Sequence, residues 1–328
     1  MKANHSRFLV CLMAVSLLVA CLAGCRQAPL SDHKVRIGVI KALGTVSPFL
    51  SEKLGYFAAE GLEVSVVEFN TGPALMEAFA AGNLDLAYGG LAPANTWRSQ
   101  GIALKVVASC NDGGHLVIVH AGAGLSAPAD LKGRTVAAPT AGSVTDTLLR
   151  GLLALELAGL DPAKDMTILP GIAPADMPAA LFLTKQVQAI VTWEPFAAQA
   201  LLQYPDARVL FSFPAWWKER YGSFYVTNVV SARQSFIDQR PEILKRMLRA
   251  HQQTQDFINQ QPDKANSLIA AELNLPVAVI AKARESMSFG YDVDVAAGLR
   301  LLEFSKRLGY IKQIPTAGEL FDLRFLGK

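Results

Sequence analysis

The chain has 328 residues, of which 51% are hydrophobic and 18% charged, and a formal net charge of +3. This near-neutral balance excludes the strongly basic surface by which proteins hold nucleic acid. The length and apolar content are sufficient for two well-filled cores. The five histidines show no spacing typical of metal ligands, so we expect no metal site.

The first residues have the pattern of a secretion signal. Lys2 and Arg7 precede an almost wholly apolar segment at 8–22, and Leu22-Ala23-Gly24-Cys25 follows. A basic start, an apolar middle and a small-residue end are the order of a cleaved signal. The apolar segment is shorter than the roughly 18 residues of a spanning helix, although a transmembrane anchor is the alternative. Residues 1–24 are therefore predicted to be removed.

Leu-Ala-Gly-Cys also resembles the lipobox of bacterial lipoproteins. The resemblance implies cleavage before Cys25 and lipidation of its sulfur, with residues 25–33 as a tether to the membrane. Of the cysteines, only Cys110 lies beyond this segment. It leaves no partner for an internal disulfide and is expected to be a buried thiol.

The chain then alternates strands with helices. The β-branched segment at 35–40 predicts a strand, and Ser47-Pro48 predicts the N-cap and first residue of a helix that Gly61 ends. After the strand and this helix we expect a strand at 62–69, a helix at 74–81 and a strand at 84–88.

The same order returns further along the chain. Gly44-Thr45-Val46 and Gly61-Leu62 recur 98 residues later as Gly142-Ser143-Val144 and Gly159-Leu160. In the second copy we expect a strand at 134–138, a helix at 144–157, a strand at 165–169, a helix at 179–184 and a strand at 187–192.

The repeated order predicts an α/β protein with two lobes of similar build. Strands that alternate with helices pair in parallel through right-handed crossovers, so each lobe is expected to hold a mostly parallel sheet flanked by helices. One larger doubly wound sheet is the alternative. The constant offset across strand, loop and helix end favours two lobes.

The pattern changes after residue 207. A strand at 209–211, an aromatic and turn-rich segment at 213–221 and a β-prone segment at 223–230 precede several helices that begin at residue 240. These helices must cover a lobe that is already built. We therefore expect lobe I to comprise 34–121 plus 226–328 and lobe II to comprise 122–225, with Gly122-Ala123-Gly124 as a linker.

The two repeated loops are candidates for a ligand site. In parallel α/β sheets, ligands bind beyond the carboxyl ends of the strands, where Gly44-Thr45 and Ser143-Val144-Thr145 each precede a helix. The free N–H groups of a helix start and a neighbouring hydroxyl favour an anion. Helix capping by Ser143, with Asp146 as its capping-box partner, explains the second loop alone equally well. The matching pair favours a site.

Gly89-Gly90-Leu91 and Trp193-Glu194 end the third strand of each lobe and extend the candidate site. Trp193 suits an apolar wall, with a buried structural tryptophan as the alternative. Glu194 and Asp146 do not suit a pure anion site, so either they point away or the ligand also carries a cationic group. No nucleophile elbow, phosphate loop or complete dinucleotide fingerprint follows a strand, which favours binding over catalysis.

Several motifs in this order resemble the substrate-binding lipoproteins of ABC importers in the nitrate, sulfonate and taurine group. They are Gly55-Tyr56-Phe57, Gly72-Pro73, Ala81-Gly82-Asn83-Leu84-Asp85, Asp130-Leu131-Lys132-Gly133-Arg134 and Trp193-Glu194-Pro195. The resemblance implies a type II periplasmic-binding-protein fold whose lobes, joined by two crossover strands, close on a small solute. It implies a monomer in the periplasm or at the cell surface, without cofactor or catalysis, that serves a permease and ATPase complex.

Within this group, Thr71-Gly72-Pro73 and Ser223-Phe224-Tyr225 look most like the aliphatic-sulfonate binders, which adds Phe224 and Tyr225 to the expected site. An aliphatic sulfonate or taurine-like solute is favoured over a nitrate-like anion. A pyrimidine or thiamine-precursor-like heteroaromatic is the alternative ligand, and an enzyme or a sensor is less favoured. Gln188 stands where the group usually has Asp, while Lys41 and Asn111-Asp112-Gly113-Gly114 lie where it varies with the ligand.

Overall fold

The computed structural model describes residues 33–69 and 72–327. The predicted signal segment, Cys25, Thr71 and nearly all of the predicted tether lie outside the described residues. Residues 35–328 group into one unit, whose architecture is given below. Within the described part of the chain, none of the helices has the length and apolar character needed to span a membrane.

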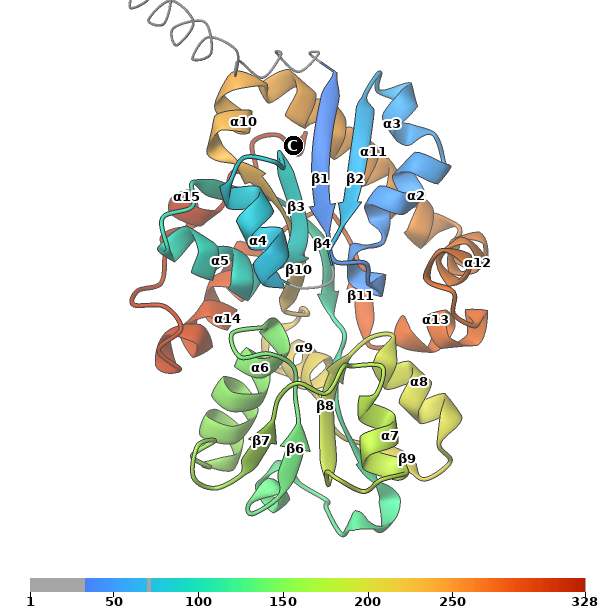
Figure 1. Ribbon diagram of the computed structural model, residues 1–328, viewed down its shortest axis with the longest axis vertical. Coiled ribbons are helices and arrows are strands. Elements are labelled where there is room, and N and C mark those ends of the chain that lie inside the picture. Colours follow the sequence, from blue (N-terminus) through green and yellow to red (C-terminus); the bar gives the residue numbers. More distant parts are fainter. Residues whose placement is uncertain (1–32, 70–71, 328) are drawn as a thin grey trace, which may run out of the picture. The chain divides into compact units, whose positions relative to one another are not determined.

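Two sheets carry the fold (Figure 1). The six-stranded sheet has the order β11-β4-β10-β3-β1-β2, and the five-stranded sheet has the order β7-β6-β8-β5-β9. The first comprises β1 (Lys34–Val39), β2 (Glu63–Glu68), β3 (Leu86–Gly90), β4 (Leu104–Gly113), β10 (Val226–Arg233) and β11 (Met287–Phe289). The second comprises β5 (His115–His120), β6 (Thr135–Ala137), β7 (Thr167–Leu169), β8 (Ala189–Trp193) and β9 (Ala207–Ser212). The predicted α/β class with two sheets is confirmed.

The duplication is visible in the topology. In each sheet a parallel pair forms the core, β1 with β3 and β6 with β8, and an antiparallel strand follows, β10 beside β3 and β5 beside β8. The outer neighbours β4 and β9 are also antiparallel to β10 and β5. The sheets are mixed: in each one a strand that arrives from the other sheet runs against its neighbours, and in the first sheet β11 is also antiparallel to β4.

The chain changes sheet at Gly114, between β4 and β5, and returns between β9 and β10. Of the expected linker Gly122-Ala123-Gly124, the first two residues instead belong to a 3-10 turn after β5, Ala121–Ala123. The return passes through α9 (Phe213–Tyr221), a helix where a turn-rich segment was predicted. Ser212 accepts a hydrogen bond from the third residue of this helix, and Gly222 ends it at a φ of 80°. The lobe limits at residues 121 and 225 stay predictions.

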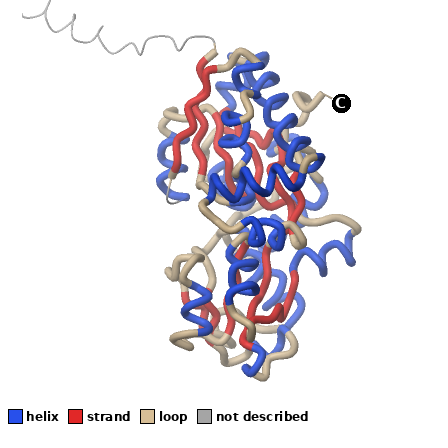
Figure 2. The backbone as a smooth tube through the Cα atoms, turned by 90° about the vertical axis from the view of Figure 1, so that its right-hand side faces the viewer, coloured by secondary structure: helices blue, strands red, loops and turns tan. Residues whose placement is uncertain are grey.

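Helices flank the strands of both sheets (Figure 2). Those before the first change of sheet and after the return are α2 (Ser47–Lys53), α3 (Tyr56–Ala59), α4 (Gly72–Ala80), α5 (Leu91–Ser99), α10 (Gln234–Gln239), α11 (Pro241–Gln260), α12 (Pro262–Leu273), α13 (Val277–Ala283), α14 (Val295–Arg307) and α15 (Ala317–Leu320). Between the two changes of sheet are α6 (Val144–Thr147), which continues as a π-helix over Leu148–Ala158, then α7 (Met177–Phe182) and α8 (Phe196–Gln203).

Tertiary contacts override one local prediction at the start of α2. Ser47, predicted as the N-cap, is instead the first residue of the helix, and its hydroxyl lies 3.3 Å from Nδ1 of His251. The other ring nitrogen of His251 bonds the carbonyl of Ser109 at 2.8 Å. Burial lowers the pKa of His251 to about 4, so the ring is neutral at physiological pH. A buried polar chain therefore joins α11, α2 and β4 where simple capping was expected.

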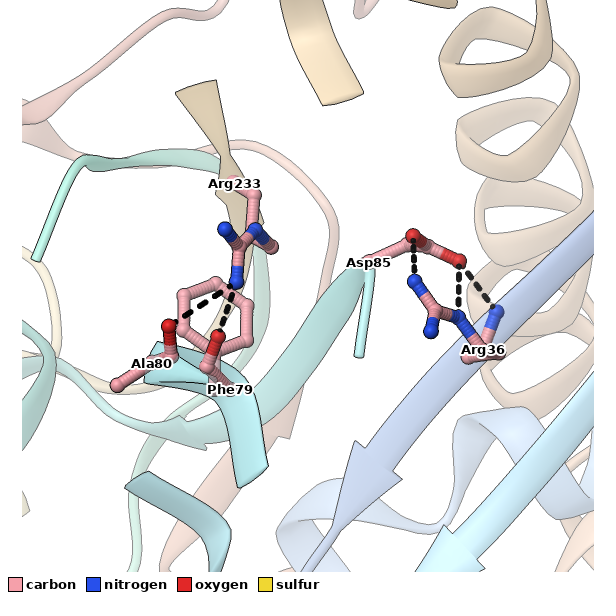
Figure 3. A network of polar contacts seen from close by, with 5 residues as sticks. All are labelled: Arg36, Phe79, Ala80, Asp85 and Arg233. Atoms are coloured by element: carbon pink, nitrogen blue, oxygen red, sulfur yellow. Dashed lines mark hydrogen bonds and ion pairs between the residues drawn. The ribbon is translucent and has the colours of Figure 1, made fainter. Parts of the chain in front are cut away.

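At equivalent positions of the two sheets, different side chains accept a hydrogen bond from the backbone of a neighbouring strand. In the first sheet, the Asp85 carboxylate accepts hydrogen bonds from the backbone N–H of Arg36 at 2.8 Å and from its guanidinium (Figure 3). In the second sheet, Oε1 of Gln188 accepts from the backbone N–H of Thr135 at 2.9 Å. The amide of Gln188 thus accepts from a strand backbone as Asp85 does, without an ion pair.

The corner at Gly113 generates a stability prediction. Gly113 has a φ of 72°, and a Cβ built there would lie 2.8 Å from the carbonyl oxygen of Ser286. We expect Gly113→Ala to lower the free energy of unfolding by about 2–3 kcal/mol, because backbone strain and a clash with a backbone atom add. Gly124→Ala is the matched control, since φ is 68° there and nothing lies within 4 Å. Urea denaturation should show a cost of only about 1 kcal/mol for the control, and equal costs would contradict the steric argument.

Candidate functional site

A cavity of about 180 Å³ lies where strand ends of the two sheets meet. An engineered apolar cavity of about 150 Å³ accommodates benzene, so this one suits a ligand of roughly six to eight non-hydrogen atoms. The lining comes from the carboxyl ends of β1, β3, β4, β6 and β8 and from the starts of β5, β10 and β11. The lining residues are Ile40, Ala42, Gly44, Thr45, Gly89, Gly90, Pro93, Asn111, Gly113, Gly114, His115, Ser143, Val144, Thr145, Trp193, Glu194, Thr227, Asn228 and Met287.

Most of the predicted site residues meet in this cavity. Thr45 and Ser143, the hydroxyl residues of the two repeated loops, both line it. The other predicted residues in the lining are Gly44, Gly89, Gly90, Val144, Thr145, Trp193 and Glu194. The duplicated loops therefore converge on one cavity, as their common offset indicated.

Leu91, Phe224 and Tyr225 are not in the cavity lining. The Leu91 side chain is fully buried in the core, where it packs toward Gly298 of α14. Tyr225 is also fully buried and shares a hydrogen bond of 2.9 Å with Nδ1 of His115, which itself lines the cavity. Phe224 lies beside Gly113 at the return to the first sheet. Tyr225 therefore contacts the cavity lining from behind: its hydroxyl bonds His115 and its carbonyl accepts from Gly113.

The first loop depends on a glycine for close approach. A Cβ on Gly44 would lie 2.3 Å from Oδ1 of Asn111 and 2.5 Å from Nδ2 of Asn228. These two side chains lie on paired strands and are joined by a hydrogen bond of 2.7 Å from Asn228 to Asn111. The Thr45 hydroxyl donates to the carbonyl of Ile40 at 2.6 Å, so it holds the loop in shape. Only glycine lets this backbone rest on the asparagine pair.

The second loop combines capping with a free hydroxyl. Oγ of Ser143 accepts from the backbone N–H of Asp146 at 3.1 Å, which confirms the cap. Asp146 reaches back to the N–H of Gly142 rather than to that of Ser143, so the capping box is shifted by one residue. Among the described residues, the Thr145 hydroxyl has no hydrogen-bond partner, although the residue is buried and lines the cavity. It is available to a ligand.

The two carboxyl groups that did not suit an anion site differ in direction. Asp146 is fully buried and does not line the cavity; it accepts from Nε of Arg150 at 2.6 Å and from the Tyr310 hydroxyl. Glu194 does line the cavity and is 4% exposed. Burial raises the pKa of Glu194 to about 7, although hydrogen bonds from Ser286 and from the backbone oppose this. One acid therefore points away and the other faces the ligand space.

No lysine or arginine is among the described residues that line the cavity. Lys41, which lies between two lining residues, instead contacts Glu272 at 2.7 Å and lies over the Phe49 ring. Burial lowers the pKa of His115 to about 3, so its imidazole is neutral. Negative charge on a ligand would therefore be held by backbone N–H groups and neutral side chains rather than by a cation.

Sequence reasoning missed Asn228, Thr227 and His115 as cavity residues. All three lie near the ends of strands that enter one sheet from the other. The sequence repeat does not include these strands, so it could not predict which of their residues reach the cavity. One signal was available: Asn is depleted in strands, yet Asn228 interrupts a β-branched segment. Asp112, noted as variable, does not line the cavity; burial raises its pKa to about 7, and it accepts from Ser109.

The polar groups around the cavity are mostly neutral. The buried His115 bonds a tyrosine rather than a serine or cysteine nucleophile. Cys110 is a buried free thiol outside the cavity lining, as predicted for a structural cysteine. Among the described residues, no cluster of His, Cys, Asp and Glu has a geometry that could hold a metal ion. The result is a mostly neutral cavity with one acid in its lining.

Comparison with known proteins gives a consistent result. A protein of Bacillus subtilis (strain 168), provisionally named an aliphatic sulfonates-binding protein, is 28% identical over 284 residues, which cover 83% of this chain and 80% of that protein. The periplasmic aliphatic sulphonate binding protein SsuA from Escherichia coli has a similar structure, with a TM-score of 0.73 at 22% identity over 90% of this chain and 92% of that one. The periplasmic nitrate-binding protein NrtA from Synechocystis PCC 6803 has a TM-score of 0.72 at 16% identity, covering 88% and 84%.

The fold is not restricted to binding proteins. The desulfurization enzyme DSZB has a TM-score of 0.64 at 17% identity, covering 89% of this chain and 97% of that one. Likeness at this identity shows the fold alone. The sequence profile of the NMT1-like family matches residues 28–274, well over half of the chain. The protein therefore belongs to the NMT1-like family and has the two-sheet fold of periplasmic binding proteins.

Proposed function

We propose that the protein is the solute-binding component of an ABC importer and captures a small organic solute with an anionic group. An aliphatic sulfonate or taurine-like solute is favoured over a nitrate-like anion. The observation that carries this proposal is the cavity in which the repeated loops bring Thr45 and Ser143 together. The sulfonate- and nitrate-binding names of similar proteins agree with it.

The cavity favours an organic anion over a bare oxyanion. Its volume of about 180 Å³ exceeds what a four-atom ion would fill, and Val144, Trp193 and Met287 add apolar lining. An apolar lining with a few placed polar groups is typical of sites for small organic ligands. We infer that the alkyl part of the solute packs on these residues while its anionic end meets the loops.

The proposed location rests on the apolar segment at 8–22 and on the Leu22-Ala23-Gly24-Cys25 motif. We propose that residues 1–24 are removed and that lipid on Cys25 anchors the protein at a membrane surface, in the periplasm or at the cell surface. The solute would then pass to a permease and ATPase complex. This placement fits the periplasmic binding proteins that share the fold.

A heteroaromatic ligand such as a pyrimidine is the second candidate. Trp193 lines the cavity and is partly exposed, so a flat ring has an aromatic surface on which to stack. The lack of a basic side chain in the described lining is also compatible with an uncharged ring.

A titration panel separates these ligands. We expect calorimetry of the purified protein to show one site for a short sulfonate, weaker binding of nitrate because it fills less of the cavity, and no binding of a methylpyrimidine. Binding of the pyrimidine alone, with quenching of tryptophan fluorescence, would favour the second candidate. No heat with any member of the panel would remove the ligand assignment.

Thr145 and Thr45 should separate binding from stability. Thr145→Val removes a hydroxyl that has no partner among the described residues, so binding of the charged sulfonate should weaken by about 1.5–3 kcal/mol with little change in the melting temperature. Thr45→Val instead leaves the Ile40 carbonyl without its donor and should lower the free energy of unfolding by about 1–3 kcal/mol. Calorimetry and urea denaturation measure the two effects, and unchanged affinity in Thr145→Val would exclude Thr145 from the site.

A further inference from the structure

Glu194 is an acid at the cavity wall whose position is fixed by two hydrogen bonds. Oε1 accepts from the Ser286 hydroxyl at 2.8 Å, and Oε2 accepts from the backbone N–H of Ala198 at 2.9 Å. A carboxylate offers about four lone-pair positions, so these bonds leave acceptor capacity. Glu194 is 4% exposed and belongs to the cavity lining, so a bound ligand would lie beside it.

No cation in the described structure balances this carboxylate directly. The basic side chain with a resolved effect on it is Lys282, whose ammonium group is 2.7 Å from Glu285 instead. The cavity lining adds no lysine or arginine, and His115 is neutral. A buried carboxylate is costly unless it is paired, and burial accordingly raises the pKa of Glu194 to about 7.

We propose that Glu194 selects solutes that carry a cationic amino group in addition to their anionic group, so that the preferred ligand is a small zwitterion such as an aminoalkanesulfonate. This inference rests on the proposed function, because it assigns the second end of a solute whose anionic end meets the repeated loops. The ammonium group would lie at Glu194 and form the charge-assisted hydrogen bonds that the carboxylate lacks.

The charge balance of the cavity agrees with a zwitterion. A simple alkanesulfonate would bring a second negative charge into a cavity that Glu194 lines, so its binding would favour the protonated form of Glu194. A zwitterion adds no net charge and supplies the cation that the lining lacks. The same residue would therefore favour one class of sulfonate and disfavour the other.

The test compares taurine with ethanesulfonate, which has the same carbon chain and sulfonate but no amino group. At pH 7.5 we expect the unaltered protein to bind taurine at least tenfold more tightly. Glu194→Gln can keep both hydrogen bonds, since its Oε1 can accept from Ala198 while its Nε2 donates to Ser286. In this variant we expect the taurine preference to fall at least tenfold, through weaker taurine binding and equal or tighter ethanesulfonate binding.

Glu285→Gln is the matched control, because it removes a neighbouring negative charge from an exposed side chain outside the cavity lining. We expect this control to keep the taurine preference. Equal affinity of the unaltered protein for both sulfonates would overturn the role of Glu194 while leaving the proposed function intact, whatever the stability of the variant. Unchanged taurine binding in a folded Glu194→Gln variant would do the same. Failure of the unaltered protein to bind either sulfonate would refute both proposals.

Discussion

The site depends on three backbone hydrogen bonds at the corner where the chain leaves its first sheet. The N–H of Gly113 donates to the carbonyl of Tyr225 at 2.9 Å, and the N–H of Gly114 donates to that of Ser286 at 2.8 Å. The carbonyl of Gly114 in turn accepts from the N–H of Glu194 at 2.9 Å. The outgoing strand, the returning segment, the segment after α13 and the end of β8 are thereby held at one point, and each of these four segments contributes residues to the cavity lining within a few positions of it. Both glycines have positive φ, so this corner requires them.

Duplication explains why a single cavity can be built from two similar halves. Each sheet contributes one loop before a helix and one strand end, and the halves differ where their surroundings differ. The Gly44 loop rests on an asparagine pair, whereas the Ser143 loop is secured by its own cap and by Asp146. A common backbone therefore presents unlike chemistry from its two sides, which an asymmetric solute requires.

The sequence was sufficient for the parts of the site that lie within the repeat. The offset identified Thr45 and Ser143, and the strand ends identified Gly90 and Glu194, because parallel strands end at the same edge of a sheet. It failed for Asn228, which enters on an antiparallel strand from the other sheet, so no local pattern gave its register. A sequence motif also does not show where a side chain points. Gly90 lines the cavity, whereas the side chain of the next residue, Leu91, is buried in the core.

The two acids that do not suit an anion site differ in how their negative charge is balanced. Each accepts a hydrogen bond from a hydroxyl in the C-terminal part of the chain, Asp146 from Tyr310 and Glu194 from Ser286. Asp146 also has Arg150, so its charge is balanced within the protein and it serves structure alone. No described lysine or arginine lies in hydrogen-bond contact with Glu194, and its balance can come from the proton that its raised pKa retains or from the bound solute. Because the same lining supplies no cation for an anionic group, the neutrality of the occupied cavity depends on the charges that the solute itself brings.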